Sequence, residues 1–168
     1  MPPKKPVAPS PPLPPAIEPR LGLSWRQWVG VPILIAIPIL ALFGVFGERQ
    51  SPAHVKSATL ELAVSYPSRF RYRQMQPIHV TVRNLSSTVA DTIKVSFDTA
   101  YISRFASVKF DPLPNAAYTV DLPDVKPSES RLVSVELWGD DYGNHRGAIV
   151  ARHGTDSAIV HLSTLVFP

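Results

Sequence analysis

The sequence predicts an all-β sandwich of about seven to eight strands, preceded by one N-terminal transmembrane α-helix and a proline-rich extended arm. Three observations indicate this. Residues 1–20 contain nine prolines, residues 29–47 carry no charge, and residues 57–168 alternate apolar and polar side chains at a period of two. The last pattern is typical of half-buried strands, and no stretch after residue 47 has a convincing helical stripe.

The proline density of residues 1–20, the expected cytoplasmic arm, disfavours helix and sheet and favours extended polyproline II conformation. One interpretation is a tail without fixed structure. The other is an arm that becomes ordered on a partner surface, since Pro-Pro-Leu-Pro-Pro is similar to ligands of proline-reading modules. The candidate partner contacts in the arm are Pro11, Pro12, Pro14 and Pro15.

Residues 21–47 are expected to form an interfacial turn and a membrane-spanning helix. The nineteen uncharged residues 29–47 would rise roughly 28 Å as a helix, close to the hydrocarbon thickness of a bilayer. A cleaved signal peptide has a shorter apolar run, and a helix of a soluble core has a polar face. Pro38 should kink the helix, either as a simple bend or where a partner helix packs. The expected membrane-anchor residues are Trp25, Trp28, Pro32, Pro38, Phe43 and Phe46.

The charges beside this run predict its orientation. Lys4, Lys5, Arg20 and Arg26 precede the run, against a single acid, Glu18. Arg49 and Lys56 follow it closely, so the bias near its ends is small. Because basic residues favour the cytoplasmic side, we expect a cytoplasmic N-terminus and a periplasmic C-terminal domain. The expected location is a bacterial inner membrane, crossed once.

The β-region, residues 57–168, is expected to follow a short linker at residues 48–56. Alternation is clearest in residues 57–64, 77–84 and 91–98. Further candidate strands cover residues 106–110, 117–122, 131–137, 148–152 and 157–166. The segment 152–157 contains Gly154 and is expected to be the turn of a last hairpin.

Three stretches of the β-region resemble a known kind of domain. VTVRNLSSTVADTIKVSFD, then DLPDVKPSESRLVSVEL, then a hairpin ending HLSTLVFP resemble bacterial immunoglobulin-like domains of the CARDB and fibronectin-III-like kind. Those domains carry a Leu-x-x-Leu/Val-x-Pro-Gly-x stretch before a strand of the opposite sheet, whereas this chain has Ser128 at the glycine position. The resemblance covers residues 57–168 and implies an Ig-like sandwich with a binding or scaffolding role.

Charge and cysteine content exclude several classes of protein. The formal net charge is +4, but residues 48–168 hold 13 basic and 12 acidic side chains, so the β-region is close to neutral. No basic patch of the kind that binds nucleic acid is evident. The chain has no cysteine, which removes thiol catalysis and cysteine-bound cofactors and leaves stability to the core.

Nothing in the sequence predicts an enzyme. The histidines lack metal-ligand spacing, and His79 and His161 fall on polar strand faces. Asp140, Asp141 and Asn144 gather oxygen ligands, but the EF-hand pattern is incomplete and a turn is favoured over calcium binding. Neither a phosphate-binding loop nor a nucleophile motif occurs. We therefore expect no catalytic residue, no cofactor, no metal and no small-molecule substrate.

Two stretches of the β-region combine arginine with aromatic residues. Residues 66–75, YPSRFRYRQM, suit phosphate headgroups, an acidic partner or a simple solvated edge strand. The loop 137–147 offers either a contact surface or a cap for the sandwich. Asn84-Leu85-Ser86 fits a glycosylation sequon, although hairpin loops favour Asn and Ser in any case. The candidate partner contacts are Arg69, Arg71, Arg73, Trp138, Tyr142 and Arg146.

These features predict a non-catalytic, single-pass accessory subunit that stabilises a larger membrane protein complex. Its partners would be other membrane protein subunits and the lipid bilayer, not nucleic acid. An energy-converting host, either a photosynthetic reaction centre with its antenna or a respiratory complex, is favoured because small single-span subunits without chemistry are frequent there. The alternative is a free-standing, membrane-anchored adhesion or envelope-binding module.

Overall fold

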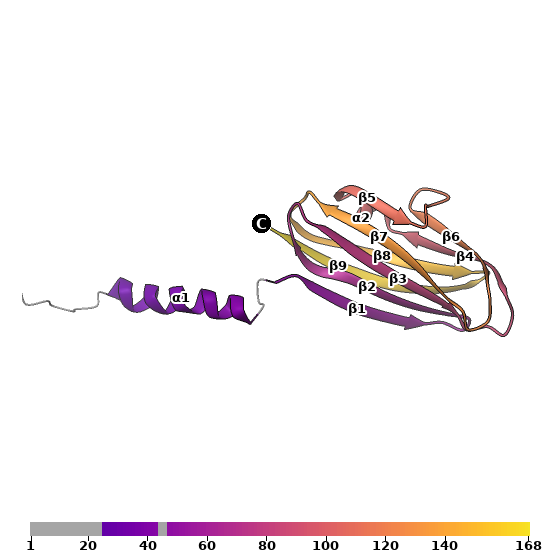
Figure 1. The fold of residues 1–168 in the computed structure, drawn as a ribbon, viewed down its shortest axis with the longest axis horizontal. Helices are drawn as coiled ribbons and strands as arrows, with labels where there is room; N and C mark the ends of the chain where they lie inside the picture. The colour runs from indigo at the N-terminus through magenta and orange to yellow at the C-terminus, as the bar shows by residue number, and fades with distance from the viewer. Residues whose placement is uncertain (1–24, 44–46) are drawn as a thin grey trace, which may run out of the picture. The chain divides into compact units, whose positions relative to one another are not determined.

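The computed structural model describes residues 25–43 and 47–168. Over these residues the expected all-β sandwich is confirmed, with nine strands instead of seven to eight (Figure 1). The elements are α1 (Trp25–Leu42), β1 (Arg49–Lys56), β2 (Leu60–Arg71), β3 (Met75–Asn84), β4 (Ala90–Phe97), α2 (Thr99–Ile102), β5 (Phe105–Asp111), β6 (Thr119–Val125), β7 (Ser130–Gly139), β8 (Gly143–His153) and β9 (Asp156–Phe167). Helix α1 and the β-domain, residues 47–168, fall into separate compact units.

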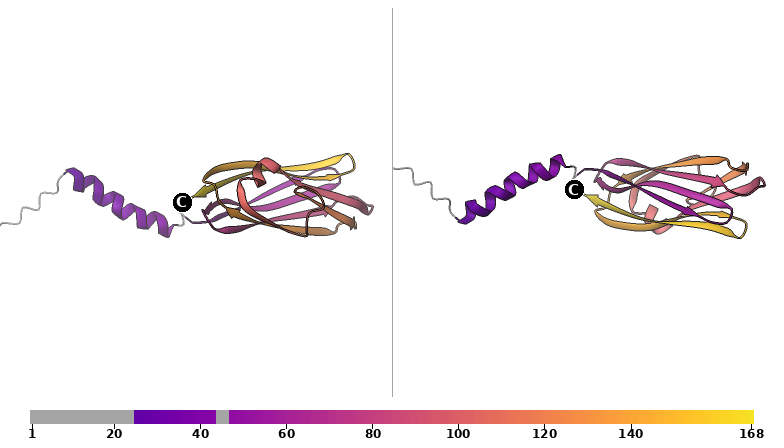
Figure 2. Two further views of the ribbon diagram at one scale, coloured as in Figure 1. Left: turned by 90° about the horizontal axis from the view of Figure 1, so that it is seen from above. Right: turned by 90° about the horizontal axis from the view of Figure 1, so that it is seen from below.

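The β-domain has two layers that share strand β2. The strands are hydrogen-bonded in the order β5-β7-β3-β2-β9-β8-β4-β6, and β1 also pairs with β2. Figure 2 shows the layers facing each other, with β8 and β9 in one and β1 to β3 in the other. Side chains between the layers form one apolar core, as the alternation predicts: β3, for example, buries Ile78, Val80 and Val82 and exposes His79.

Strand β2 passes from one layer to the other at Pro67. Residues Leu60 to Ser65 pair antiparallel with β3, whereas Arg69 to Arg71 pair in parallel with β9. The Pro67 carbonyl at the crossing accepts a hydrogen bond from the buried Thr164 hydroxyl at 2.8 Å. That bond uses the only Thr164 proton, so the Tyr101 hydroxyl, 2.9 Å away, is the donor to Thr164.

Helix α2 places this tyrosine in the core. The Asp98 carboxylate accepts a hydrogen bond from the Ala100 N–H and caps the helix, which buries Tyr101 and Ile102. Burial raises the pKa of Tyr101 to about 12, so its hydroxyl stays protonated at neutral pH. A side chain at Gly147 would collide with Tyr101, and only glycine lets β8 pass beneath the ring.

Residues 48–56 are not the expected linker, because Arg49–Lys56 form strand β1. Pro52 and the alternation of only Ala53 and Val55 gave a weak strand pattern. Proline is tolerated because β1 pairs only with β2. On the solvent-facing side of an edge strand, a residue needs no N–H to donate to a neighbouring strand. Strand β2 therefore lies between β1 on one side and β3 and then β9 on the other, so one of the two interpretations of residues 66–75, a simple solvated edge strand, is wrong.

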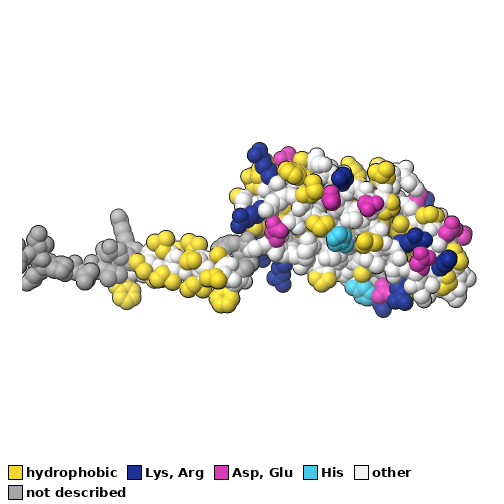
Figure 3. Space-filling model, in the orientation of Figure 1, with side chains coloured by type: hydrophobic (Ala, Val, Ile, Leu, Met, Phe, Trp, Pro, Cys, Tyr) yellow, Lys and Arg dark blue, Asp and Glu magenta, His cyan; other side chains and the backbone are white. Residues whose placement is uncertain are grey.

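Helix α1 covers part of the run expected to cross a membrane. It contains Pro32 and Pro38, and its apolar side chains are exposed from Val29 to Leu42 (Figure 3). Among the described residues, no helix combines the length and the apolar character that a membrane crossing requires. Phe46 and the arm prolines at 11, 12, 14 and 15 lie outside the described residues.

Two turns account for other features of the sequence. Ser128, at the position where the resemblance implies glycine, has a φ of 62°, the left-handed conformation that glycine adopts most easily. Its N–H donates to the Asn84 carbonyl at 2.9 Å. The expected last hairpin is confirmed between β8 and β9, with Gly154 at a φ of 57°.

Asp156, at the turn of this hairpin, fastens the far end of the domain. Its carboxylate accepts hydrogen bonds from the Thr59 hydroxyl and N–H at 2.6 and 2.7 Å and from the Ser57 hydroxyl at 2.8 Å. These bonds join the β1–β2 loop to the β8–β9 turn. Because they favour the charged form, they lower the pKa of Asp156 to about 2.

Replacing Thr164 with valine should destabilise the β-domain more than removing its partner hydroxyl. Thr164→Val keeps the shape but leaves the Pro67 carbonyl and the Tyr101 hydroxyl buried without partners. We expect a loss of about 2–4 kcal/mol in the free energy of unfolding. Tyr101→Phe leaves the bond to Pro67 intact and should cost about 1 kcal/mol. Urea unfolding measures both, and equal losses would contradict the role given to Thr164.

Asp156 should make the β-domain sensitive to acid. Its pKa is lower in the folded state, so its stabilising contribution is complete above the ordinary value near 4 and is lost as the pH falls towards 2. In Asp156→Asn, stability should depend less on pH across this window. The measurement is the urea midpoint as a function of pH. Asp91→Asn, at an exposed strand position, is the matched control and should keep the wild-type slope.

Candidate functional site

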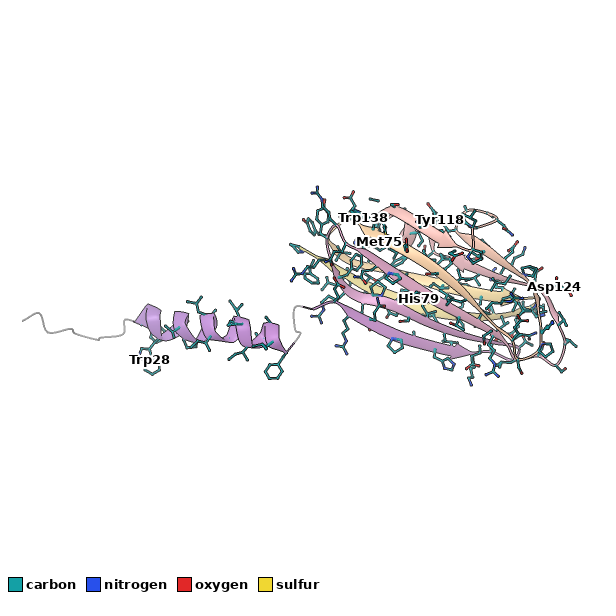
Figure 4. The ribbon with its side chains drawn as sticks, viewed as in Figure 1. Trp28, Met75, His79, Tyr118, Asp124 and Trp138 are labelled. Atoms are coloured by element: carbon teal, nitrogen blue, oxygen red, sulfur yellow. The ribbon has the colours of Figure 1, made fainter. Side chains whose placement is uncertain are left out.

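Most of the predicted contact residues of the β-domain come together at one end, here called the proximal end. It comprises residues 48–49, 69–75, 104, 138–146 and 165–167, where the chain enters at β1 and where β2, β7 and β9 finish. Strand register brings these segments together: Arg49 lies opposite Arg69, Met75 opposite Trp138, and Gly143 opposite Val166. Figure 4 shows Met75 and Trp138 near each other at this end.

The β2–β3 turn at the proximal end is fixed by backbone hydrogen bonds. The Tyr72 N–H donates to the Phe167 carbonyl at 2.8 Å, and the Arg73 N–H donates to the Gly139 carbonyl at 2.9 Å. Arg73 has a φ of 59°, so the turn contains a left-handed residue. A Cβ on Gly139 would lie 2.7 Å from the Phe70 ring, which explains why β7 needs glycine here.

Aromatic rings hold the arginine side chains of this turn. The Arg71 guanidinium lies 5.9 Å from the centre of the Phe167 ring, and that of Arg73 lies 5.2 Å from the centre of the Tyr72 ring. Tyr72 also packs against Tyr142, with ring centres 4.5 Å apart. Such contacts stabilise a cation while its N–H groups remain directed to solvent.

A shallow pocket of about 360 Å³ lies beside Tyr142. Arg104 and Asp141 form an ion pair there at 3.7 Å, and Arg146 lines the same pocket. His145 is buried: its Nε2 donates to the Asp141 carbonyl at 3.0 Å and its ring packs on Phe105. This histidine is therefore a structural residue that holds the loop.

The proximal end carries a net positive charge within a nearly neutral domain. It holds six arginines and three acids, whereas the rest of residues 48–168 hold seven basic and nine acidic side chains. Figure 3 shows dark-blue Lys and Arg side chains at this end of the domain. The asymmetry arises from register, because the arginines come from β1, β2, the β2–β3 turn, the α2–β5 connection and β8.

The oxygen-bearing side chains of residues 140–144 make hydrogen bonds within the protein. Asp140 accepts a hydrogen bond from the Tyr72 hydroxyl at 3.3 Å, and Asn144 accepts one from the Ser163 hydroxyl at 2.9 Å. Across residues 25–43 and 47–168, no group of three or more metal-ligating side chains occurs. The turn interpretation of residues 140–144 fits these contacts.

The sequon is buried. Asn84 is fully enclosed, and its Nδ2 donates to the Thr88 and Val125 carbonyls, each at 2.9 Å. Its Oδ1 accepts from the N–H and the hydroxyl of Ser86. Every polar atom of this side chain has a partner, so Asn84 holds the β3–β4 loop and offers no amide to a glycosylating enzyme.

A second concave surface lies along β5. It has a volume of about 530 Å³, and its lining is mostly apolar, including Val108, Phe110, Leu113 and Tyr118. Figure 4 labels Tyr118 on this side of the domain. Strand β5 ends the sheet, so an unpaired edge runs beside the groove. Sequence periodicity did not find it, because Leu113 lies in an irregular loop.

The proximal end contains most of the predicted contacts of the β-domain: Arg71, Arg73, Trp138, Tyr142 and, in the pocket beside Tyr142, Arg146. Arg69 lies in β2 at the same end, opposite Arg49 and Leu165. The sequence did not indicate that Arg49, Arg104 and Phe167 also belong here. Arg49 and Phe167 are placed here by strand pairing, and Arg104 by the connection between α2 and β5.

CARDB domains, the kind of domain that the sequence resembles, are among the solved structures to which the chain is similar. The chain is similar to the crystal structure of the CARDB domain of the PF1109 protein from Pyrococcus furiosus (15% identity, TM-score 0.43, 67% of this chain and 98% of that chain). It is also similar to the solution structure of the same domain (12%, 0.44, 62% and 90%) and to domains 4 and 5 of the S-layer protein SbsC (18%, 0.36, 70% and 54%). No protein-family model matches the chain, and no curated protein is similar to it in sequence.

Replacing Asn84 should destabilise the domain because its buried amide bonds the Thr88 and Val125 carbonyls. Asn84→Ala removes the donors to Thr88 and Val125, and we expect a loss of about 2–4 kcal/mol in the free energy of unfolding. Ser86→Ala also destroys the sequon but removes only one hydroxyl, and should cost about 1 kcal/mol. Urea unfolding compares the two. Expression in a glycosylating host should add no mass at Asn84, and a glycan there would contradict the buried assignment.

Proposed function

We propose that this protein is a non-catalytic, single-pass accessory subunit, in which α1 holds the β-domain to a membrane and the β-domain contacts a larger membrane protein complex. The observation that carries the proposal is the exposure of α1. Large apolar side chains such as Ile33, Leu34 and Ile37 are each more than half exposed. A helix packed in a soluble protein buries one apolar face, whereas a helix in lipid can be apolar all round.

The β-domain supports a binding role better than a catalytic one. Its buried polar side chains are used to hold the fold: His145 holds a loop, Thr164 holds the β2 crossing, and Asn84 holds a turn. A catalytic site normally requires titratable groups with perturbed pKa values in a cleft. The groups with strongly shifted pKa values here, Tyr101 and Asp156, make structural hydrogen bonds.

The proposed arrangement places the N-terminus in the cytoplasm and the β-domain in the periplasm. This orientation rests on the basic residues that precede α1. The identity of the host complex stays a prediction, including the energy-converting host. The proline-rich arm, residues 1–20, is proposed as a second contact on the cytoplasmic side.

A second candidate function is a free-standing, membrane-anchored adhesion or envelope-binding module. The groove along β5 favours it, because an apolar cleft beside an unpaired strand edge can accept an extended segment. This alternative needs the same anchor but no stoichiometric membrane partner. Composition of the purified material therefore separates the two proposals.

Membrane fractionation of the full chain tests the anchor. The wild-type chain should remain with membranes after an alkaline carbonate wash and should co-purify with other membrane subunits in mild detergent. Ile35→Lys with Ile39→Lys should release it, because each lysine at mid-span costs about 3 kcal/mol. Leu132→Lys with Ile159→Lys makes the same change at exposed positions of the β-domain and should leave it in the membrane.

Two results would overturn this account. Recovery of the wild-type chain in the soluble fraction, beginning near residue 48, would contradict the anchor. A carbonate-resistant chain that purifies alone would retain the anchor and favour the adhesion module over the accessory subunit.

A further inference from the structure

Four arginines of the proximal end have no carboxylate partner among the described residues. Among the described residues, Lys56 and Arg83 pair with Glu61, and Arg131 pairs with Glu129. Over the same described part of the chain, no carboxylate lies within ion-pair distance of the following proximal residues: Arg49, Arg71, Arg73 and Arg146. Their charges are therefore uncompensated at contact distance.

Two of these arginines are ordered before any ligand arrives. The backbone of the β2–β3 turn is fixed to Phe167 and Gly139, and the guanidinium groups of Arg71 and Arg73 lie over aromatic rings. Both residues are exposed. Ordered guanidinium groups lose less conformational entropy on binding an anion, and each can bind a phosphate through two N–H groups.

Apolar and amphipathic side chains lie among these charges. Met75, Trp138, Tyr142 and Leu165 are 47%, 37%, 53% and 43% exposed. Trp138 and Met75 face each other across β7 and β3. Tryptophan and tyrosine favour the headgroup level of a bilayer, where one end of the ring is apolar and the other is wet.

We propose that the proximal end binds the surface of a bilayer that contains anionic phospholipids, with its arginines on the headgroup phosphates and its aromatic residues at the headgroup level. The proposal rests on the proposed function, because α1 supplies the membrane attachment. The first strand of the β-domain begins at Arg49, so the connection to the proposed anchor joins the domain at its proximal end. An acidic protein surface would share the charge, and the proposed attachment of the domain to a membrane favours lipid over such a partner.

The bilayer binding would fix the orientation of the domain. Each arginine near an anionic membrane surface contributes enough attraction to change an equilibrium about five-fold. The attraction is screened over about 10 Å at 0.1 M salt, so it acts only when the proximal end reaches the headgroups. Removing two arginines should shift the equilibrium between docked and lifted domain by roughly 30-fold at low ionic strength.

Trp138 can report this docking in the full chain. The chain has three tryptophans, so Trp25→Phe with Trp28→Phe leaves Trp138 alone. The protein is reconstituted into vesicles of phosphatidylcholine, or of phosphatidylcholine with about one-third phosphatidylglycerol, each with lipids brominated near the headgroup. We expect quenching of Trp138 to increase with phosphatidylglycerol and to fall as salt is added.

Arg71→Gln with Arg73→Gln, made in the same background, should abolish this dependence on lipid charge. Lys94→Gln with Arg152→Gln is the matched control. It removes the same charge from a cross-strand pair outside the proximal end and should behave as the parent protein. Equal responses of the two variants would overturn the proposal, as would quenching that is independent of lipid charge.

Flotation of the same samples tests the proposed anchor separately from the proposed lipid-binding surface. If the chain floats with the vesicles but Trp138 does not respond to phosphatidylglycerol, the anchor stands and the lipid-binding surface is wrong. If the chain does not float with either vesicle, the proposed anchor fails. Trp138 protection that appears only when a purified membrane complex is added would assign the surface to an acidic protein instead of lipid.

Discussion

The hydrogen bond from Thr164 to the Pro67 carbonyl is the constraint on which the rest of the domain depends. It gives the Pro67 carbonyl a partner where β2 leaves β3 and joins β9, at a position that lies between those two ladders. A buried carbonyl without a partner is costly, so the crossing requires a hydroxyl at this point. Because β2 then ends beside β9, the following turn lies between Phe167 and Gly139, and Arg71 and Arg73 reach the proximal end.

The two ends of the sandwich are built by different physical means. The far end is fastened by a carboxylate that accepts four hydrogen bonds, three of them from the loop between β1 and β2. The proximal end uses aromatic rings to order its arginines and leaves most of their charges without carboxylates. The carboxylate at the far end is therefore taken up by hydrogen bonds within the fold, whereas arginines at the proximal end remain exposed to the surroundings. This division suits a module that binds with one end and is closed at the other.

Period-two alternation was sufficient to predict eight of the nine strands, because most of them bury alternate apolar side chains. Strand β1 was missed because Pro52 interrupts a face with only two apolar residues. The layer crossing could not be predicted, since Pro67 marks a break without saying where the chain goes next. Local sequence grouped Arg71 with Arg73, but it could not place Arg49, which strand register brings opposite Arg69, or Arg104, which lies in the connection from α2 to β5. Ser128 illustrates a further limit: its left-handed backbone is visible only in the structure.

The direction of β1 has a mechanical consequence. The chain reaches the domain at Arg49 and then runs antiparallel along β2 as far as Lys56, which lies opposite Glu61. A pull on the preceding residues acts along the strand axis, so the hydrogen bonds to β2 are loaded in shear and resist together. Unzipping them one by one would need a force applied at the Lys56 side or across the sheet. A first strand in this direction lets the attachment point resist tension along the chain through all of its hydrogen bonds at once.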